Sequence, residues 1–254
     1  MSGPDNAVME GGGFRLLPDR VGDAARQMAL DYLLFQWMGR VEKGRGPVRM
    51  RRLVWREPAL TFGYRQKREE VEAERCRRGA DAPEDICRRF TGGGVVFHGE
   101  DLTWALLLPA RLALTEQPAP LIYRWLHERL RESMEEEGRR VSVHLPAPSA
   151  DGPTAPRAAC FQGPEEGDLV LMETGEKVAG AAMKRGKQGL LWQGTLQLPP
   201  FPQIDGESLT IRFGENLARH LGEDFGLDDF PAWAEEAEEE MAQQLSSEEW
   251  LNKR

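Results

Sequence analysis

The apolar positions of this 254-residue chain recur with two different periods, and each period predicts a different kind of element. Apolar residues three or four positions apart follow Asp23, with Leu30, Leu34 and Trp37 on one face, and predict a helix. Asp23 suits the N-terminus of that helix because its side chain can accept a hydrogen bond from an unpaired amide of the first turn. Similar patterns predict further helices over residues 66–80, 120–137, 207–221 and 232–245.

Short runs of apolar, β-branched and aromatic residues, separated by turn residues, predict strands between these helices. The predicted strands are 48–55, 59–64, 86–91, 95–98, 102–108, 141–145, 168–172, 177–183 and 189–198. Helices and strands are mixed and do not alternate strictly, and no internal repeat is present. The pattern therefore predicts an α+β fold with a mixed sheet.

The hydrophobic content of 40% is enough for one sizeable core. Residues 1–13 are Gly-rich and are expected to form a flexible N-terminal arm. Residues 14–254 are expected to form a single catalytic-sized domain. Its very acidic C-terminal helix is interpreted as a solvated face or a partner surface.

Charge is distributed unevenly along the chain, whose net charge is -9. Residues 1–140 hold 24 basic and 22 acidic side chains, whereas residues 141–254 hold 9 and 20. The basic run Arg49, Arg51 and Arg52 suggests a docking surface for an acidic protein partner. The alternative is that these arginines lie on solvated faces of strands. Nucleic acid is a poor partner for a chain this acidic.

Neither membrane nor metal binding is indicated. No apolar run approaches the roughly 20 residues that cross a bilayer, and no signal-peptide pattern opens the chain, so a cytoplasmic protein is expected. Cys76, Cys87 and Cys160 form no CxxC pair, which favours reduced thiols over a zinc site.

The stretch 88–103, RRFTGGGVVFHGEDLT, combines three glycines with a histidine. It fits neither phosphate-binding pattern, GxxxxGK[ST] or GxGxxG, and the glycines lead into a strand and not a helix. Spacing alone favours a tight hairpin or bulge, with close approach of the backbone to a ligand as the alternative. His98 has no carboxylate at metal-ligand spacing, so no metal role is assigned to it.

Cys160 follows a Pro-rich connection and lies at the edge of a loop, where reactive groups are often displayed. A thiol becomes a nucleophile when a neighbouring cation lowers its pKa, and Lys177 in the segment GEKVAG is a candidate cation. By spacing alone, the interpretation of Lys177 as a solvated turn residue is favoured.

Three segments together resemble the lipoate-protein ligase and octanoyltransferase superfamily, which includes biotin ligases. They are RRFTGGGVVFH, GEKVAGAAMKR and LLWQGTLQL, and the similarity covers roughly residues 15–220. The resemblance implies the biotin/lipoate ligase catalytic-domain fold, an α+β fold with a mixed, largely antiparallel sheet flanked by helices.

Two chemistries occur within this superfamily. Its ATP-dependent ligases activate lipoate as an acyl-adenylate, whereas one octanoyltransferase branch carries a CF dipeptide and an LT motif. Cys160-Phe161 and Leu102-Thr103 look like those two marks. Little sequence remains after residue 220 for the accessory domain of the ligases, which also favours the transferase. The chain departs from the common patterns at Gly94, Gly99 and Gln193.

The resemblance implies that the Cys160 thiolate attacks the thioester of an octanoylated acyl carrier protein. A lysine of a lipoyl domain, in 2-oxoacid dehydrogenases or the glycine cleavage H protein, then takes the octanoyl group. Lys177 would assist as a cation, and no cofactor is expected. The implied substrate-binding residues are Arg89, Gly92, Gly93, Gly94, His98, Thr103, Gly180, Gly194 and Thr195.

Three other functions remain open at this point. One is an ATP-dependent lipoate-protein ligase, which would need ATP and magnesium. Another is an octanoyl amidotransferase acting between lipoyl-type proteins through the same cysteine. The third is a non-catalytic module that binds an acyl carrier or a lipoyl domain.

Overall fold

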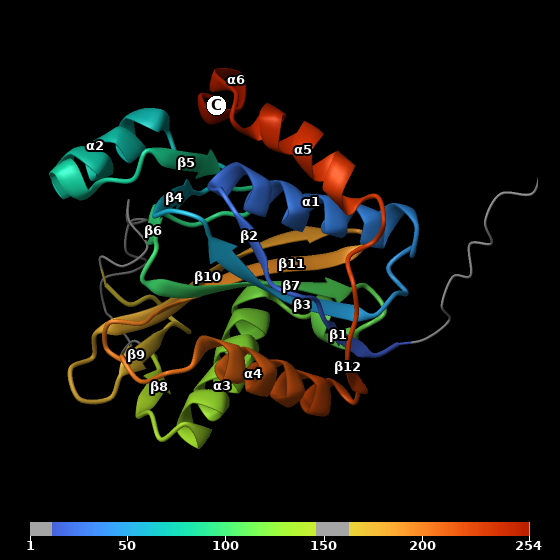
Figure 1. The fold of residues 1–254 in the computed structure, drawn as a ribbon. Helices are drawn as coiled ribbons and strands as arrows, with labels where there is room; N and C mark the ends of the chain where they lie inside the picture. Colours follow the sequence, from blue (N-terminus) through green and yellow to red (C-terminus); the bar gives the residue numbers. More distant parts are fainter. Residues whose placement is uncertain (1–11, 146–162, 254) are drawn as a thin grey trace, which may run out of the picture.

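The computed structural model describes residues 12–145 and 163–253, and Figure 1 shows a twisted sheet with helices on both faces. The helices are α1 (Ala24–Arg40), α2 (Arg68–Arg78), α3 (Ala119–Glu136), α4 (Gly206–Leu221), α5 (Ala234–Leu245) and α6 (Glu248–Leu251). Two short 3-10 turns, η1 (Gly79–Asp81) and η2 (Ala113–Glu116), complete the helical elements of the described residues.

Nine of the described strands form the large sheet. Their order is β12 (Phe225–Leu227), β1 (Phe14–Leu16), β3 (Val48–Trp55), β7 (Asp101–Pro109), β11 (Gly189–Gln197), β10 (Lys177–Gly186), β9 (Leu169–Leu171) and β8 (Val141–Val143), with β2 (Arg20–Gly22) also beside β3. From β3 to β8 every pairing is antiparallel, whereas β1, β2 and β12 pair in parallel. The predicted fold class, a mixed and largely antiparallel sheet, is confirmed.

A small sheet packs beside the large one. It has the order β5 (Asp85–Arg88), β4 (Ala59–Phe62) and β6 (Val96–His98). β4 runs parallel to β5 and antiparallel to β6, and His98 at the end of β6 contacts Asp101 and Thr103 at the start of β7.

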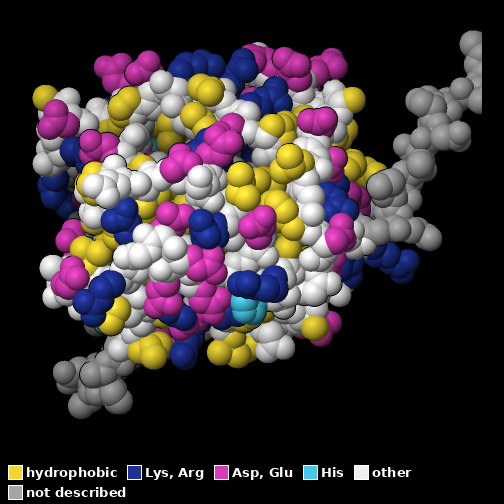
Figure 2. Space-filling model, turned by 60° about the horizontal axis from the view of Figure 1, so that its bottom comes forward, with side chains coloured by type: hydrophobic (Ala, Val, Ile, Leu, Met, Phe, Trp, Pro, Cys, Tyr) yellow, Lys and Arg dark blue, Asp and Glu magenta, His cyan; other side chains and the backbone are white. Residues whose placement is uncertain are grey.

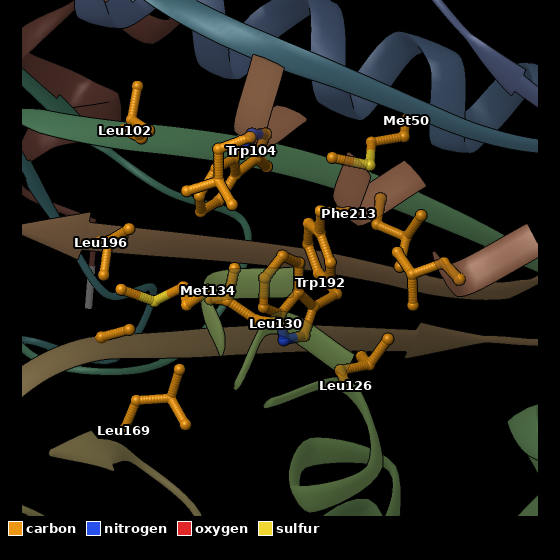
Figure 3. Close-up of a cluster of buried hydrophobic side chains, with 14 of the residues drawn as sticks. Met50, Leu102, Trp104, Leu126, Leu130, Met134, Leu169, Trp192, Leu196 and Phe213 are labelled. Atoms are coloured by element: carbon orange, nitrogen blue, oxygen red, sulfur yellow. The ribbon is translucent and has the colours of Figure 1, made fainter. Parts of the chain in front are cut away.

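The period-two pattern of β7 shows how one strand serves two cores. Trp104, Leu106 and Leu108 belong to the core under α3 and α4, which Figure 3 shows with Trp192 and Phe213 around Trp104. The intervening residues, Ala105 and Leu107, belong to the core under α1 and α5. Because both faces of β7 are covered, all nine of its residues are buried.

Most predicted elements are present, with ends shifted by a few residues. The predicted strand 48–55 is β3, and the predicted cap Asp23 accepts a hydrogen bond from the Arg26 amide at 2.9 Å. Three strands were not predicted, namely β1, β2 and β12. Each has three residues and includes an arginine or a glycine, so none shows the apolar, β-branched run that marks the equally short β6, β8 and β9.

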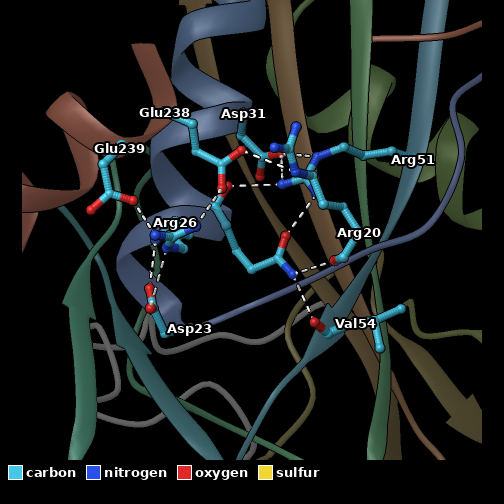
Figure 4. Close-up of polar contacts among 9 residues, drawn as sticks. Arg20, Asp23, Arg26, Asp31, Arg51, Val54, Glu238 and Glu239 are labelled. Atoms are coloured by element: carbon cyan, nitrogen blue, oxygen red, sulfur yellow. Dashed lines mark hydrogen bonds and ion pairs between the residues drawn. The ribbon is translucent and has the colours of Figure 1, made fainter. Parts of the chain in front are cut away.

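The acidic C-terminal helix is more than a solvated face. α5 packs along α1 and buries Ala234, Glu238, Ala242 and Leu245. The Glu238 carboxylate lies 3.2 Å from Arg20 Nε, and both side chains are labelled in Figure 4. Burial raises the pKa of Glu238, although the charges of nearby arginines oppose this shift.

The basic run on β3 is not a docking surface. Arg51 is fully buried and donates to Asp31 Oδ1 at 2.7 Å (Figure 4). Arg49 is 5% exposed and pairs with Glu42 at 2.7 Å, and Arg52 is also paired with a carboxylate. These guanidinium groups bind carboxylates of the same chain, so the predicted surface at these arginines is wrong.

The face formed by α3 and α4 carries both signs of charge intermixed (Figure 2). Arg131 pairs with Glu128 and Glu135, and Arg212 pairs with Glu136 and Glu137. This face is therefore not a field of a single sign. Within the described residues, no helix combines the length and apolar character needed to cross a bilayer.

Candidate functional site

A pocket opens where the small sheet meets α1 and the strands β7, β10 and β11. It is a small, partly open pocket whose walls are mainly apolar, as is usual for small-molecule sites. Its lining residues are Met28, Thr61, Arg89, Val96, His98, Thr103, Gly180, Ala181, Ala182, Gln193, Gly194 and Thr195. Six of the predicted binding residues thus meet in one pocket: Arg89, His98, Thr103, Gly180, Gly194 and Thr195.

Asp101 organises one wall of the pocket. Its carboxylate, fully buried, lies 2.8 Å from His98 Nδ1 and accepts hydrogen bonds from the Thr103 and Thr195 hydroxyls at 2.6 and 2.5 Å. Burial alone would raise the pKa of Asp101, but His98 and the two threonines outweigh it and lower the pKa. Thr103 and Thr195 face each other because β7 and β11 pair at these positions.

Arg89 connects this wall to the glycine loop. Its guanidinium donates to the Thr61 hydroxyl at 2.8 Å, and that hydroxyl lies 2.8 Å from His98 Nε2. The same guanidinium donates to the carbonyls of Gly92 and Gly94 at 2.8 and 2.9 Å. Arg89 therefore supports both the loop and the pocket.

The three glycines of residues 92–94 are not among the residues that line this pocket, and their predicted contact with substrate stays a prediction. Gly92 and Gly93 are exposed, and their loop crosses over Gly63. A Cβ on Gly63 would lie only 1.9 Å from the Gly93 carbonyl oxygen. Gly93 itself has a φ of +83°, which disfavours residues with a Cβ. The crossing thus requires a glycine at position 63, and the positive φ favours a glycine at position 93.

Gln193, one of the departures from the common pattern, links the pocket to the interior. Its amide donates to Asp31 Oδ2 at 2.6 Å and accepts from the Thr91 hydroxyl at 2.7 Å. Asp31 in turn pairs with Arg51 at 2.6 Å. Burial raises the pKa of Asp31, although the Arg51 charge opposes this. Gln193 thereby ties the glycine loop to α1.

Lys177 lies directly behind the pocket wall and is not a solvated turn residue. Its amine pairs with Asp168 Oδ2 at 2.8 Å, and its side chain is only 5% exposed. A Cβ on Gly180, which lines the pocket, would lie 2.8 Å from Lys177 Nζ. Gly180 therefore leaves room for the amine beside the pocket.

Cys160, the predicted nucleophile, lies outside the described residues. Of the other two thiols, Cys76 is exposed and Cys87 is buried. Burial raises the pKa of Cys87 and makes it a poor nucleophile. Among the described residues, no three His, Cys, Asp or Glu side chains are placed to hold a metal ion.

Sequence reasoning missed Asp31, Asp101, Tyr123 and Asp168. In the sequence, Asp101 is only a neighbour of the LT motif, and Asp168 is only the start of a strand. Tyr123 and His127 lie four residues apart on α3, a spacing that places both on one face. That spacing could have indicated a polar cluster on α3. It could not have indicated that the cluster contacts Gly167 and Asp168, which lie far along the chain.

Comparison with known proteins places this site in a family. The lipoyl protein ligase A/B catalytic domain family matches residues 23–200. The octanoyltransferase LipM of Geobacillus kaustophilus is 30% identical over 210 residues, covering 79% of this chain and 70% of the relative. That of Anoxybacillus flavithermus is 31% identical over 180 residues, covering 68% and 61%. The chain thus spans about two thirds of the length of these curated relatives.

Solved structures agree on the fold. Lipoate-protein ligase A bound with ATP superposes with a TM-score of 0.70 at 19% identity, covering 96% of this chain and 98% of the other. The lipoate protein ligase of an archaeal lipoylation system from Thermoplasma acidophilum superposes with a TM-score of 0.67 at 18% identity, covering 94% and 95%. At sequence identities this low, the superpositions show a similar fold and nothing about function.

The predicted resemblance is confirmed, and the names of the sequence relatives support octanoyl transfer in protein lipoylation as the reaction. The family match covers well over half of the chain and includes the segments that hold Arg89, His98, Lys177 and Thr195. The chain belongs to the lipoyl protein ligase A/B catalytic domain family.

Proposed function

We propose that this protein moves an octanoyl group from the thioester of an acyl carrier protein to a lysine of a lipoyl domain, through Cys160. The observation that carries the proposal is the pocket with Lys177 behind its Gly180 wall. The octanoyltransferase relatives support the same reaction. The apolar walls that Met28, Val96 and Ala181 contribute to the pocket suit the hydrocarbon chain of an octanoyl group.

The reaction divides into two acyl transfers. In the first, the Cys160 thiolate attacks the carbonyl carbon of the donor thioester, and the bond to the carrier sulfur breaks and releases a carrier thiolate, which takes up a proton. In the second, the neutral lysine amine attacks the enzyme thioester, forms an amide, loses a proton and releases the Cys160 thiolate. Division into two steps is the usual advantage of covalent catalysis.

Lys177 has two tasks in this proposal. Its positive charge favours the thiolate form of Cys160, and it stabilises the negative charge that develops on the carbonyl oxygen. Removal of one such donor typically reduces kcat by about 10²–10³-fold. The kcat of Lys177→Met for transfer from octanoyl carrier protein should therefore be lower than that of the unaltered protein by about 10²–10³-fold.

The covalent step is tested by intact-mass measurement. The protein is mixed with octanoylated carrier protein, without acceptor, and is expected to gain one octanoyl group. Cys160→Ala should gain none, while Cys76→Ala, which removes an exposed thiol away from the pocket, should be acylated normally. Octanoylation that persists in Cys160→Ala would refute the proposed nucleophile.

Two alternatives have their own discriminating results. Lipoate-dependent ATP–pyrophosphate exchange that survives Cys160→Ala would identify an ATP-dependent ligase. Acylation of Cys160 by an octanoylated lipoyl-type protein, but not by octanoyl carrier protein, would identify an amidotransferase. Binding of carrier or lipoyl domain without any acyl transfer would indicate a non-catalytic module.

A further inference from the structure

Lys177 is part of a buried cluster that extends away from the pocket. Its ion pair with Asp168 joins two side chains that are 5% and 1% exposed. The Asp168 carboxylate also accepts hydrogen bonds from the Tyr123 hydroxyl at 2.5 Å and from the Glu165 amide at 2.7 Å. Asp168 is thus held by three donors and has little freedom to move away from the lysine.

Helix α3 holds the segment that carries Asp168. Tyr123 and His127 lie one turn apart on the same face of α3, which brings both to residues 167–168. His127 Nδ1 lies 2.7 Å from the Gly167 carbonyl oxygen, while Tyr123 binds the next residue, Asp168. The carboxylate is therefore fixed both through its own oxygens and through its backbone.

The Tyr123 hydroxyl also reaches the pocket wall. It accepts a hydrogen bond from the Ala181 amide at 2.9 Å, and Ala181 lines the pocket. The pairing of β9 and β10 shifts register between Lys177 and Ala179. Such an irregularity re-aims side chains, and it is often found beside active sites. One hydroxyl consequently connects the pocket wall with the carboxylate that holds the lysine.

We propose that Asp168 is a positioning residue that fixes the Lys177 ammonium beside the pocket, and that Tyr123 and His127 on α3 hold Asp168 in place. This inference rests on the proposed function, because it assumes that Lys177 takes part in acyl transfer. A buried ion pair is by itself weak evidence for stabilisation, since desolvation offsets much of its attraction. The ion pair lies directly behind Gly180, which lines the pocket. This position suggests that the pair serves the reaction and not the stability of the fold.

The kinetic test is a double-mutant cycle on transfer from octanoyl carrier protein to a lipoyl domain. Asp168→Asn should lower kcat by about 10²-fold, the size expected when a reacting group is misplaced by about 1 Å. KM for the carrier should change only a few-fold. In the Lys177→Met background, Asp168→Asn should have no further effect, because Asp168 acts through the lysine.

A merely structural role gives a different result. If Asp168→Asn lowers kcat by the same factor with and without Lys177, the inference is overturned. Tyr123→Phe provides a milder second variant that removes only the hydroxyl, and its smaller loss should also vanish in Lys177→Met. Asp224→Asn is the matched control, because it removes the carboxylate of an exposed ion pair with Arg15 and should leave transfer unchanged.

An activity-independent measurement separates this inference from the proposed function. The chain has six lysines, so ¹³C-lysine labelling gives few signals, and Lys177→Arg assigns that of Lys177. A fixed side chain has two inequivalent Hε protons, which average when it becomes mobile. They should be resolved in the unaltered protein and merge in Asp168→Asn, with the other signals unchanged. An unaltered splitting would refute positioning, whereas absent transfer by the unaltered protein would refute only the proposed function.

Discussion

At the scale of single residues, the interior is organised by carboxylates that each have a cation or several donors. The Asp31 carboxylate pairs with Arg51 and accepts a hydrogen bond from Gln193. The Asp101 carboxylate contacts His98 and accepts hydrogen bonds from two threonines. Removing one partner of such a pair is costly because the other charge stays buried, whereas replacing both with apolar groups is often tolerated. This asymmetry makes the pairs testable.

Arg51→Met should lower the free energy of unfolding by about 3–5 kcal/mol, because Asp31 then stays buried without its cation. Asp31→Leu combined with Arg51→Met should recover most of that loss. Urea denaturation of the single and double variants checks this. Losses that simply add would show that the two side chains are not coupled.

His127 should make stability depend on pH. Burial lowers its pKa to about 4, so between about pH 6.5 and 4 the unfolded chain binds a proton that the folded chain does not. Stability should therefore fall with falling pH in this window, by about 3 kcal/mol in total at ~1.4 kcal/mol per pKa unit. In His127→Gln this contribution should be absent from the unfolding free energy measured across the window. His220→Gln, at a 32% exposed imidazole, should retain it.

At the scale of elements, the C-terminal helices hold the strand that leads to the glycine loop. Arg88, at the end of β5, donates to the carbonyls of Trp250 and Leu251 at 3.1 and 2.7 Å. The Trp250 indole donates back to the Arg88 carbonyl at 3.0 Å and packs 4.6 Å from the Phe90 ring. The acidic C-terminal segment thus supports the first arginine of the RRFTGGG motif.

Trp250→Ala should therefore act on β5 as well as on α6. Because the indole is only partly buried, we expect a loss of about 2 kcal/mol, below the roughly 3–5 kcal/mol of a fully buried tryptophan. Amide hydrogen exchange should become faster in residues 85–91 and 248–253. Glu249→Ala, at an exposed position of α6, is the control. Unchanged exchange in residues 85–91 would show that the helix does not support this strand.

At the scale of the whole molecule, two helix layers share one sheet. Trp104 and Trp192 lie in the core under α3 and α4, whereas Trp55, Trp233 and Trp250 pack on the core under α1 and α5. The two cores lie on opposite faces of the same strands. Unfolding of one core should therefore expose the apolar side chains of the other core. The prediction that residues 14–254 form a single domain can be tested on this basis.

Unfolding in urea should give coincident transitions for tryptophan fluorescence and far-UV circular dichroism if the two cores unfold together. Two variants, each of which keeps the tryptophans of only one core, should show the same urea midpoint by tryptophan fluorescence. Separate midpoints for the two cores would contradict a single cooperative domain.

The sequence predicts local structure well where a periodic run is long enough. The strand 48–55 and the capped helix after Asp23 are both recognisable, whereas β1 and β12 are not, because an arginine or a glycine interrupts their three residues and leaves no apolar run. Family motifs alone assign Arg89, His98, Thr103 and Thr195 to one binding site, and these residues do line one pocket. The crossing of the glycine loop over Gly63 could not be predicted, since a crossing of two backbones cannot be seen in one segment.

The sequence by itself determined the fold class, most helices and strands, and the family to which the chain belongs. Only the tertiary structure decided which polar groups lie inside. Arg49 and Arg51 resemble solvated charges on an alternating strand, but β3 is central and α1 covers the face to which they point. Likewise, Lys177 resembles a turn residue until α3 brings Tyr123 and His127 to the segment of Asp168. Burial and charge pairing depend on segments that lie far apart in the chain, and no local pattern contains that information.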